Sequence, residues 1–323
     1  MVQMIQPEVA LNAAIFAAFF AMISTELMAA SAIVFKYEES TKKVFRFLVP
    51  IWEITGTFFV FYAVNVEALV PDALPLVAYA YISYILIFLI LYVGRNASII
   101  AAEYIWKNRV VNRKLLYTVY AIITYILGIL ILVIYTSLLS GVGVNVGART
   151  FNLVEFISFL PDDGFIAGSA ILLFGLGAVF YNLSVRRYLP LVVTGIGMAI
   201  AGLSFVYLGD ISTPAFIVVP AVITLILPLL WMFDRTRQIV SNKLLFQGAM
   251  AISAFFLIYT VYPWLFAKTL NLTLLLNNSA MQTQIFYTTI IGGIILVALS
   301  LVFFRIFYRA GDSGQQESET PAH

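Results

Sequence analysis

The sequence contains no cysteine, and its only histidine, His323, is the last residue. The lack of cysteine excludes disulfides, iron–sulfur clusters and thiolate metal sites. Zinc and haem sites are usually built on imidazole or thiolate ligands, so we expect no metal and no cofactor to be bound by this chain's own ligands. A serine hydrolase triad is excluded as well, because it needs an interior histidine.

Charged residues are also scarce. They make up 11% of the 323 residues, whereas apolar residues make up 62%. A soluble domain typically has about 25% charged residues and cannot cover its surface with so few. The formal net charge of +2 gives no indication of a nucleic-acid partner. The composition therefore indicates a protein embedded in lipid.

Apolar runs long enough to cross a bilayer recur along the chain. A membrane helix needs about 20 mostly apolar residues, and continuous runs favour helices over the alternating strands of a barrel. We therefore predict an all-α polytopic membrane protein, with one transmembrane domain over residues 1–310 and a disordered tail over 311–323. Nine spans are predicted: Ala10–Val34, Phe47–Val64, Leu76–Val93, Leu116–Leu139, Phe165–Ser184, Leu189–Leu208, Pro214–Phe233, Leu244–Phe266 and Gln284–Phe304.

The basic residues predict the orientation of these spans. All lysines and arginines except Arg149 and Lys268 fall at loops on one side, whereas the loops on the other side are mainly acidic. Short cytoplasmic loops carry the excess of lysine and arginine. We therefore predict a multi-pass protein of the cell membrane, with its N-terminus outside and its C-terminus in the cytoplasm.

Two carboxylates lie deep in apolar sequence, Glu26 in the first span and Glu53 in the second. Counting from the cytoplasmic ends of their helices, both lie roughly 10–14 Å below the surface, which places them at matching depth. Carboxyl groups in such surroundings can load and release protons, so one interpretation is a proton path that begins in the cytoplasm. The other is a structural hydrogen bond to Thr25, Thr55 or Thr57.

Three further features of the spans have structural interpretations. Arg95 at the inner end of the third span can pair with a carboxylate or a partner subunit, although arginines at helix ends more often extend to lipid headgroups. Trp52 and the other tryptophans fit an aromatic belt at the membrane surface. The glycine pairs Gly175–Gly177, Gly195–Gly197 and Gly292–Gly293 favour close contacts between helices.

Taken in order, these segments resemble the second subunit of cytochrome bd-type quinol oxidases. Pro50–Thr55 (PIWEIT) resembles the Pro-x-Trp-Asp-Gly-Asn stretch that opens the second span of that family. Thr25–Glu26 resembles its Thr-Asp pair, Arg95 its arginine after the third span, and Val261–Phe266 (VYPWLF) a late segment. Glutamate replaces aspartate at both acidic positions, and Ile54–Thr55 replaces the Gly-Asn, so the chain resembles a divergent member.

The resemblance implies a heterodimer with a first subunit that carries b- and d-type haems and oxidises quinol while reducing oxygen to water. Small accessory subunits and a structural quinone are compatible with it. This chain would supply a cytoplasmic proton-uptake path, with Glu53 and Glu26 transferring protons and Trp52 and Arg95 structural or lining the path. The family fold implies two four-helix bundles plus one peripheral helix.

Two other functions fit the same residues. A stand-alone proton-coupled transporter could use Glu26 and Glu53 for coupling, but such proteins often show two inverted halves, and no inverted repeat is clear here. A haem-free assembly subunit without a proton role would tolerate the loss of either acid. The sequence does not separate apolar faces that meet lipid from faces that meet a partner.

Overall fold

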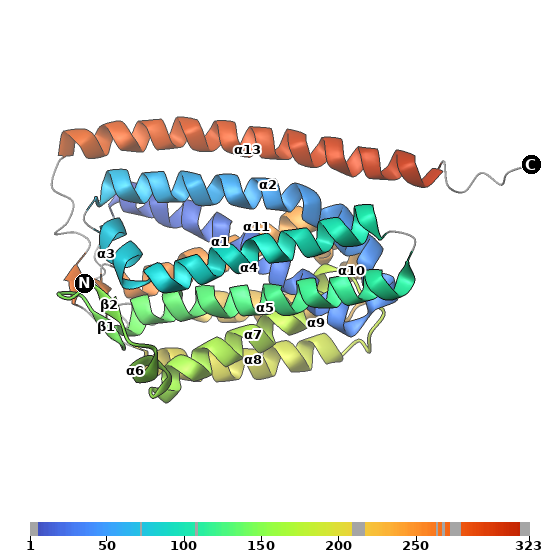
Figure 1. The fold of residues 1–323 in the computed structure, drawn as a ribbon, viewed down its shortest axis with the longest axis horizontal. Coiled ribbons are helices and arrows are strands. Elements are labelled where there is room, and N and C mark those ends of the chain that lie inside the picture. The colour runs from blue at the N-terminus through green and yellow to red at the C-terminus, as the bar shows by residue number, and fades with distance from the viewer. Residues whose placement is uncertain are drawn as a thin grey trace, which may run out of the picture.

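The computed structural model describes residues 6–71, 73–106, 109–208, 217–262, 264–266, 269–271 and 279–316. Within these ranges the side chains of residues 45–53, which include Trp52 and Glu53, lie outside the description. The long helices lie roughly side by side along the longest axis of the molecule (Figure 1). They are α1 (Pro7–Phe35), α2 (Tyr37–Leu69), α4 (Ile82–Ile100), α5 (Val110–Ser140), α7 (Leu160–Phe180), α8 (Leu189–Tyr207), α9 (Val218–Trp231), α11 (Lys243–Val261) and α13 (Ser279–Gln316).

Short elements connect the long helices at the two ends of the bundle. Two antiparallel hairpins pair β1 with β2 and β3 with β4. The other connecting elements are single helical turns or short helices. The short elements are α3 (Ala73–Ala80), the π-helical turn Ala101–Ile105, β1 (Val144–Asn145), β2 (Thr150–Phe151), α6 (Leu153–Ile157), α10 (Asp234–Val240), β3 (Trp264–Leu265) and β4 (Leu270–Asn271).

The all-α membrane architecture predicted from the sequence is confirmed. Among the described residues, seven helices are long and apolar enough to cross a membrane. The predicted spans Phe47–Val64 and Pro214–Phe233 overlap shorter apolar helices, Ile54–Leu69 and Val218–Trp231. The count of nine spans, their orientation and the division into two bundles stay predictions.

Two predicted spans do not match the observed helices: one is divided in two, and the other extends beyond the end of its helix. The span Leu76–Val93 is divided between α3 and α4 at Tyr81, whose hydroxyl lies 2.5 Å from Ser137 Oγ of α5. The span Leu244–Phe266 stops at Val261, because Tyr262 precedes a proline and takes an extended backbone. The last helix, α13, is described up to Gln316, within the segment predicted as a tail.

Helix α1 lies at the centre of the bundle and α13 at its edge. Helix α1 packs against α2, α5, α7 and α11, and 67% of its most apolar window is buried. Its alanines at 29, 30 and 32 belong to the main core cluster together with side chains of α5, α7, α9 and α11. In contrast, the larger contacts of α13 among the described helices are with α2 and α1. Only 6% of its most apolar segment is buried (Figure 1).

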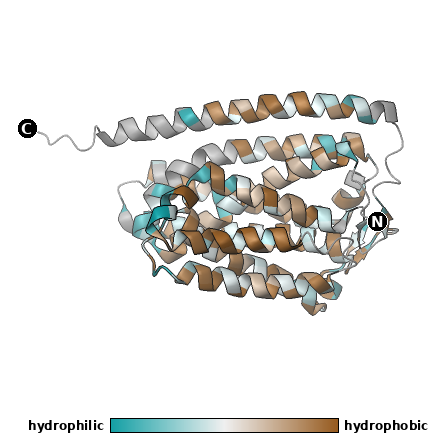
Figure 2. Ribbon diagram, turned by 180° about the vertical axis from the view of Figure 1, so that it is seen from behind, coloured by the Kyte–Doolittle hydropathy of each residue, from teal (hydrophilic) through white to brown (hydrophobic). Residues whose placement is uncertain are grey.

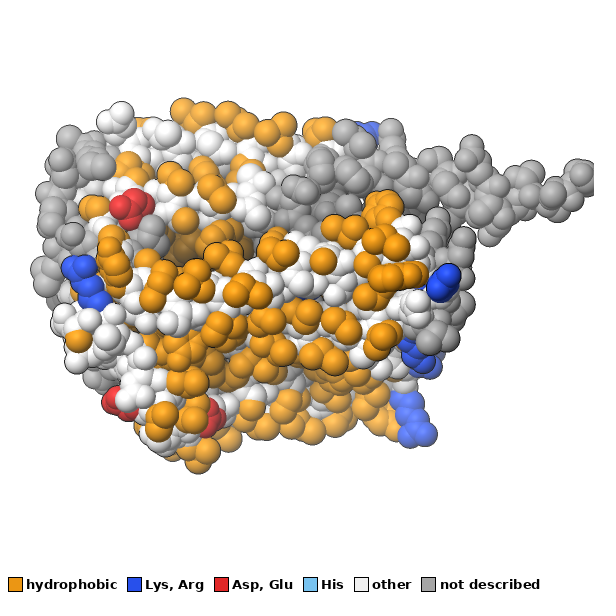
Figure 3. Space-filling model, in the orientation of Figure 1, with side chains coloured by type: hydrophobic (Ala, Val, Ile, Leu, Met, Phe, Trp, Pro, Cys, Tyr) orange, Lys and Arg blue, Asp and Glu red, His pale blue; other side chains and the backbone are white. Residues whose placement is uncertain are grey.

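Hydrophobic residues dominate the length of the helices, and polar residues collect near their ends (Figure 2). The space-filling view shows blue Lys and Arg side chains gathered at one end, whereas the red acidic side chains lie at the other end, beside a further blue group (Figure 3). We call the first the basic end, defined by Lys43, Arg187 and Arg237. We call the other the acidic end, defined by Glu67 and Glu155. The predicted orientation places the basic end in the cytoplasm.

Glycine brings α7 and α8 into close contact. A Cβ on Gly197 would lie 2.3 Å from the Leu172 nitrogen of α7, and one on Gly168 would lie 2.3 Å from the Ala201 nitrogen of α8. Neither backbone can move aside without separating the helices. The predicted glycine contact is confirmed for Gly197 and is wrong for Gly195, which has nothing within 4 Å of the same position.

These two glycines give a matched test of helix packing. We expect Gly197→Ala to lower the free energy of unfolding by about 2 kcal/mol, because the added methyl overpacks the contact with α7. Gly195→Ala should be neutral or slightly stabilising, since alanine is the better helix former and the space is open. Thermal unfolding of both variants in detergent measures the difference. Equal stabilities would contradict the close α7–α8 contact.

Candidate functional site

Glu26 and Arg95 form an ion pair inside the bundle. Arg95 Nη1 of α4 donates to Glu26 Oε2 of α1. The Arg95 side chain is only 3% exposed and the Glu26 side chain only 4%. Glu26 lies nine residues before the end of α1 at the basic end, which corresponds to a depth of about 14 Å. Charges so deep in the bundle are costly unless they are paired, and this geometry pairs them.

Neighbouring side chains contact the other nitrogens and the face of the Arg95 guanidinium. Its Nε and Nη2 atoms lie 3.1 and 3.0 Å from Asn96 Oδ1, and its Cζ lies 4.5 Å from the centre of the Tyr92 ring. These contacts hold the guanidinium facing α1 rather than the membrane surface. The interpretation that Arg95 extends to lipid headgroups is therefore wrong, and the alternative of pairing with a carboxylate is the observed one.

The threonines offered as structural partners behave differently from one another. Thr25 Oγ1 donates to the Met22 carbonyl of its own helix at 2.5 Å, so its proton is not available to Glu26. Thr55 Oγ1 is buried without a hydrogen-bond partner among the described residues. The side chains of Trp52 and Glu53 lie outside the description, although α1 and α2 do pack together. The proposed neighbourhood of Glu26 and Glu53 stays a prediction.

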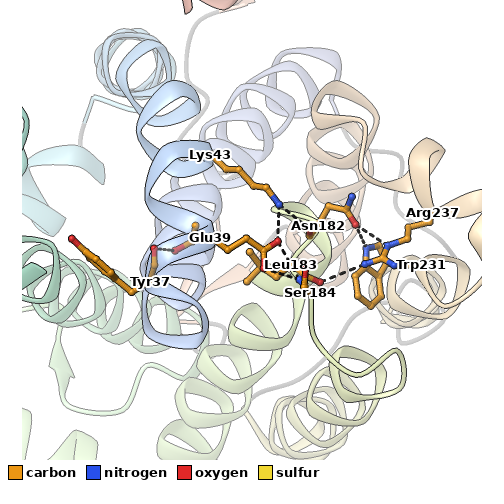
Figure 4. A network of polar contacts seen from close by, with 9 residues as sticks. Tyr37, Glu39, Lys43, Asn182, Leu183, Ser184, Trp231 and Arg237 are labelled. Atoms are coloured by element: carbon orange, nitrogen blue, oxygen red, sulfur yellow. Dashed lines mark hydrogen bonds and ion pairs between the residues drawn. The ribbon is translucent and has the colours of Figure 1, made fainter. Parts of the chain in front are cut away.

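A second polar cluster joins four segments at the basic end. Glu39 of α2 accepts hydrogen bonds from Lys43 Nζ at 2.8 Å and from the Ser184 backbone N–H, which lies 3.0 Å from its Oε2. Lys43 Nζ also donates to the Asn182 carbonyl at 3.1 Å. Figure 4 shows Glu39 and Lys43 reaching from α2 to the turn between α7 and α8. The start of α2 is thereby fixed to that turn.

Asn182 is the centre of this cluster. Its Oδ1 accepts from Trp231 Nε1 at 3.1 Å and from Arg237 Nε at 2.8 Å, so it joins the α7–α8 turn to α9 and α10 (Figure 4). The Arg237 guanidinium also stacks on the Trp231 ring, 4.1 Å from its centre. Trp231 is 0% exposed, so the predicted place in an aromatic belt is wrong for this tryptophan. Asn182 has φ +46°, a left-handed conformation that asparagine tolerates better than most residues.

The environment of Glu39 lowers its pKa. Partial burial by itself raises the pKa, but the hydrogen bonds from Lys43 and Ser184 and the positive charge of Lys43 outweigh it. A carboxyl whose pKa is lower in the folded state stabilises the fold above its unfolded pKa, and this contribution is lost as the pH falls through the folded value.

We therefore expect Glu39→Gln to be less stable than the unaltered chain at neutral pH, with the difference vanishing as the pH falls through the carboxyl range. Thermal unfolding in detergent over a pH series measures this difference. Glu38→Gln is the matched control, because Glu38 is exposed and precedes Glu39 in the same helical turn. A difference that persisted at low pH would mean that the charge of Glu39 is not the cause.

Comparison with known proteins identifies the fold. No family model matches the sequence, and no curated protein matches it either. Among solved structures, the bd oxidase from Geobacillus thermodenitrificans matches with a TM-score of 0.65 and 16% sequence identity. The match covers 94% of this chain and 99% of that chain. The chain has a bd-oxidase-like fold.

The usual side-chain ligands of metals and haem are scarce among the described residues of this bd-oxidase-like fold. These residues include no group of three or more His, Cys, Asp or Glu side chains that could hold a metal. They also contain neither histidine nor cysteine, the usual axial ligands of haem iron, since His323 lies outside the described ranges.

Sequence reasoning missed the cluster around Asn182 and the buried tyrosines near Arg95. Ser184 and Glu39 are 145 residues apart, and Asn182 is one of many asparagines near helix ends. No local spacing marks such contacts. The tyrosines carried a usable signal, because Tyr117 and Tyr120 recur with helical spacing on one apolar segment.

Proposed function

We propose that this chain is the haem-free second subunit of a bd-type terminal quinol oxidase. The observation that carries the proposal is the fold similarity, which extends over nearly the whole of both chains, to a bd oxidase. The sequence resemblance of Thr25–Glu26, Pro50–Thr55 and Arg95 supports the same assignment. The scarcity of usual haem ligands fits a division of labour with a haem-carrying first subunit.

In this role the Glu26–Arg95 pair belongs to a proton-uptake path from the basic end. Arg95 balances the carboxylate charge, and its attraction offsets part of the cost of burying Glu26 in the bundle. A proton that reaches Glu26 would neutralise it and weaken the ion pair, and its departure would restore the pair. Glu53 on the adjacent helix supplies a second acid on the same path. Trp52 and Arg95 line or shape that path.

The haems belong to the proposed partner and would supply the electron transfer from quinol to oxygen. This chain's residues would hold protons, exclude water from the bundle and bind the partner. The apolar faces of α4, α8 and α13 are exposed and would be covered by lipid, the first subunit or small accessory subunits. A structural quinone would also have to bind through apolar contacts on such a face.

A mild-detergent purification from the native membrane tests the assignment. We expect a larger subunit to copurify and the reduced-minus-oxidised visible spectrum to contain b- and d-type haem bands. Quinol-dependent oxygen consumption should accompany these bands. A folded but colourless chain that purifies alone would overturn the proposal and favour the stand-alone proton-coupled transporter.

A further inference from the structure

A stripe of polar side chains runs along the buried face of α5. Arg113, Tyr117, Tyr120 and Thr124 follow one another at intervals of four, three and four residues, which places them on one face of a helix. Tyr117 and Tyr120 are both 0% exposed, and Thr124 is 2% exposed. Tyrosine usually keeps its hydroxyl near water or a polar partner, so two fully buried tyrosines one turn apart require a reason.

The deeper tyrosine lies at the same depth in the bundle as Glu26 of the ion pair. Helix α5 packs against both α1 and α4, the helices that carry the pair. Tyr120 and Arg95 are close enough for their side chains to interact electrostatically. Tyr120 is ten residues into α5, a depth of about 15 Å, which matches the depth of about 14 Å for Glu26.

The hydroxyl of Tyr120 has no hydrogen-bond partner among the described residues. Thr124 donates its own hydroxyl to the Tyr120 backbone carbonyl at 2.7 Å. A buried hydroxyl without a partner costs free energy, and proteins usually satisfy such groups with an internal water. Such a water would be the link from Tyr120 to the Glu26–Arg95 pair, across the contacts of α5 with α1 and α4.

The shallower tyrosine connects this position to the basic end. The Tyr117 ring meets the ring of Tyr37 edge-on, with their centres 5.9 Å apart. Tyr37 is partly exposed at the start of α2. The guanidinium of Arg113 lies 5.8 Å from the centre of the Tyr117 ring, one further turn toward the surface. The stripe therefore extends from partly exposed groups to the buried ion pair.

We propose that Tyr117 and Tyr120, with internal water, relay protons from the basic end to Glu26. This relay rests on the proposed function, because it names the route by which protons reach the pair. A phenol can accept a hydrogen bond on one side while it donates on the other. In each step the phenol gives its proton toward Glu26 and takes one from the water behind it. One proton moves inward, and the tyrosine is left neutral.

The test compares Tyr120→Phe with Tyr125→Phe in the purified oxidase complex, reconstituted in vesicles with a trapped pH indicator. Tyr125 lies on the same helix, but its hydroxyl already pairs with Ser31. We expect Tyr120→Phe to slow proton uptake during turnover about tenfold and to raise the solvent isotope effect. Tyr125→Phe should match the unaltered complex in both. Equal rates for the two variants would overturn the relay.

Two further variants separate this result from the proton role of Glu26 itself. If Glu26→Gln slows uptake and neither Tyr120→Phe nor Tyr117→Phe does, the relay is wrong and the proton role stands. If Glu26→Gln has normal uptake, the proton role fails and the relay with it. Haem content and thermal unfolding establish that each complex is intact. Should Tyr120→Phe fail to assemble, a tenfold slowing in Tyr117→Phe supports the relay and normal uptake overturns it.

Discussion

Replacing Arg95 with methionine is expected to destabilise the chain by about 3–5 kcal/mol, the usual cost of removing one partner of a buried ion pair. The variant leaves the Glu26 carboxylate buried opposite an apolar side chain. It also leaves Asn96 Oδ1 without the two donors it now receives. Chemical or thermal unfolding of the purified protein in detergent measures the loss.

Two comparisons identify the buried charge as the cause. The double variant Glu26→Leu with Arg95→Met should recover most of the stability, because neither side chain then leaves an unpaired charge. Arg187→Met is the surface control. Arg187 lies 3.1 Å from Asp234, but their side chains are 58% and 71% exposed, so its loss should cost at most about 1 kcal/mol. A double variant as unstable as Arg95→Met alone would contradict the explanation.

Hydropathy was sufficient to predict the helical class and most helix positions, because a long run of apolar residues crosses lipid stably as a helix. It failed to predict the helix break and the glycine contacts, because these depend on residues distant in the sequence. The continuous apolar run is divided at Tyr81, whose hydroxyl meets Ser137, a residue 56 positions away. Gly195 and Gly197 look alike in the sequence, and only the helix that faces one of them distinguishes the two.

The candidate site was predictable in part for a similar reason. Charge in an apolar segment marks Glu26 without any knowledge of the fold, since the cost of burial is a property of the residue itself. Its partner is not marked in this way. Arg95 lies near a helix end, where headgroups are the commoner destination, and its pairing depends on how α1 and α4 pack. Tyr120 carries no charge, so the cost of burying a charge does not mark it in the sequence.

Replacing Glu53 with glutamine is expected to slow quinol-dependent oxygen consumption at least about tenfold, while the haem content of the complex stays unchanged. Glutamine keeps the shape of the side chain and a hydrogen-bonding oxygen, but it cannot carry the transferred proton. If Glu53 instead serves only as a hydrogen-bond partner, the same substitution should leave turnover intact. The oxygen-consumption rate per haem therefore distinguishes a proton-transfer role from a structural one.

Two variants of the same helix complete this test. Glu53→Asp restores the acid that the bd-type family resemblance places at this position, so we expect it to regain most of the lost turnover even though its reach is shorter. Glu67→Gln removes an exposed carboxylate at the other end of α2 and should have no effect. Slow turnover in Glu53→Gln that Glu53→Asp does not relieve would point to altered packing of α2, and the proton role would then rest on Glu26 alone.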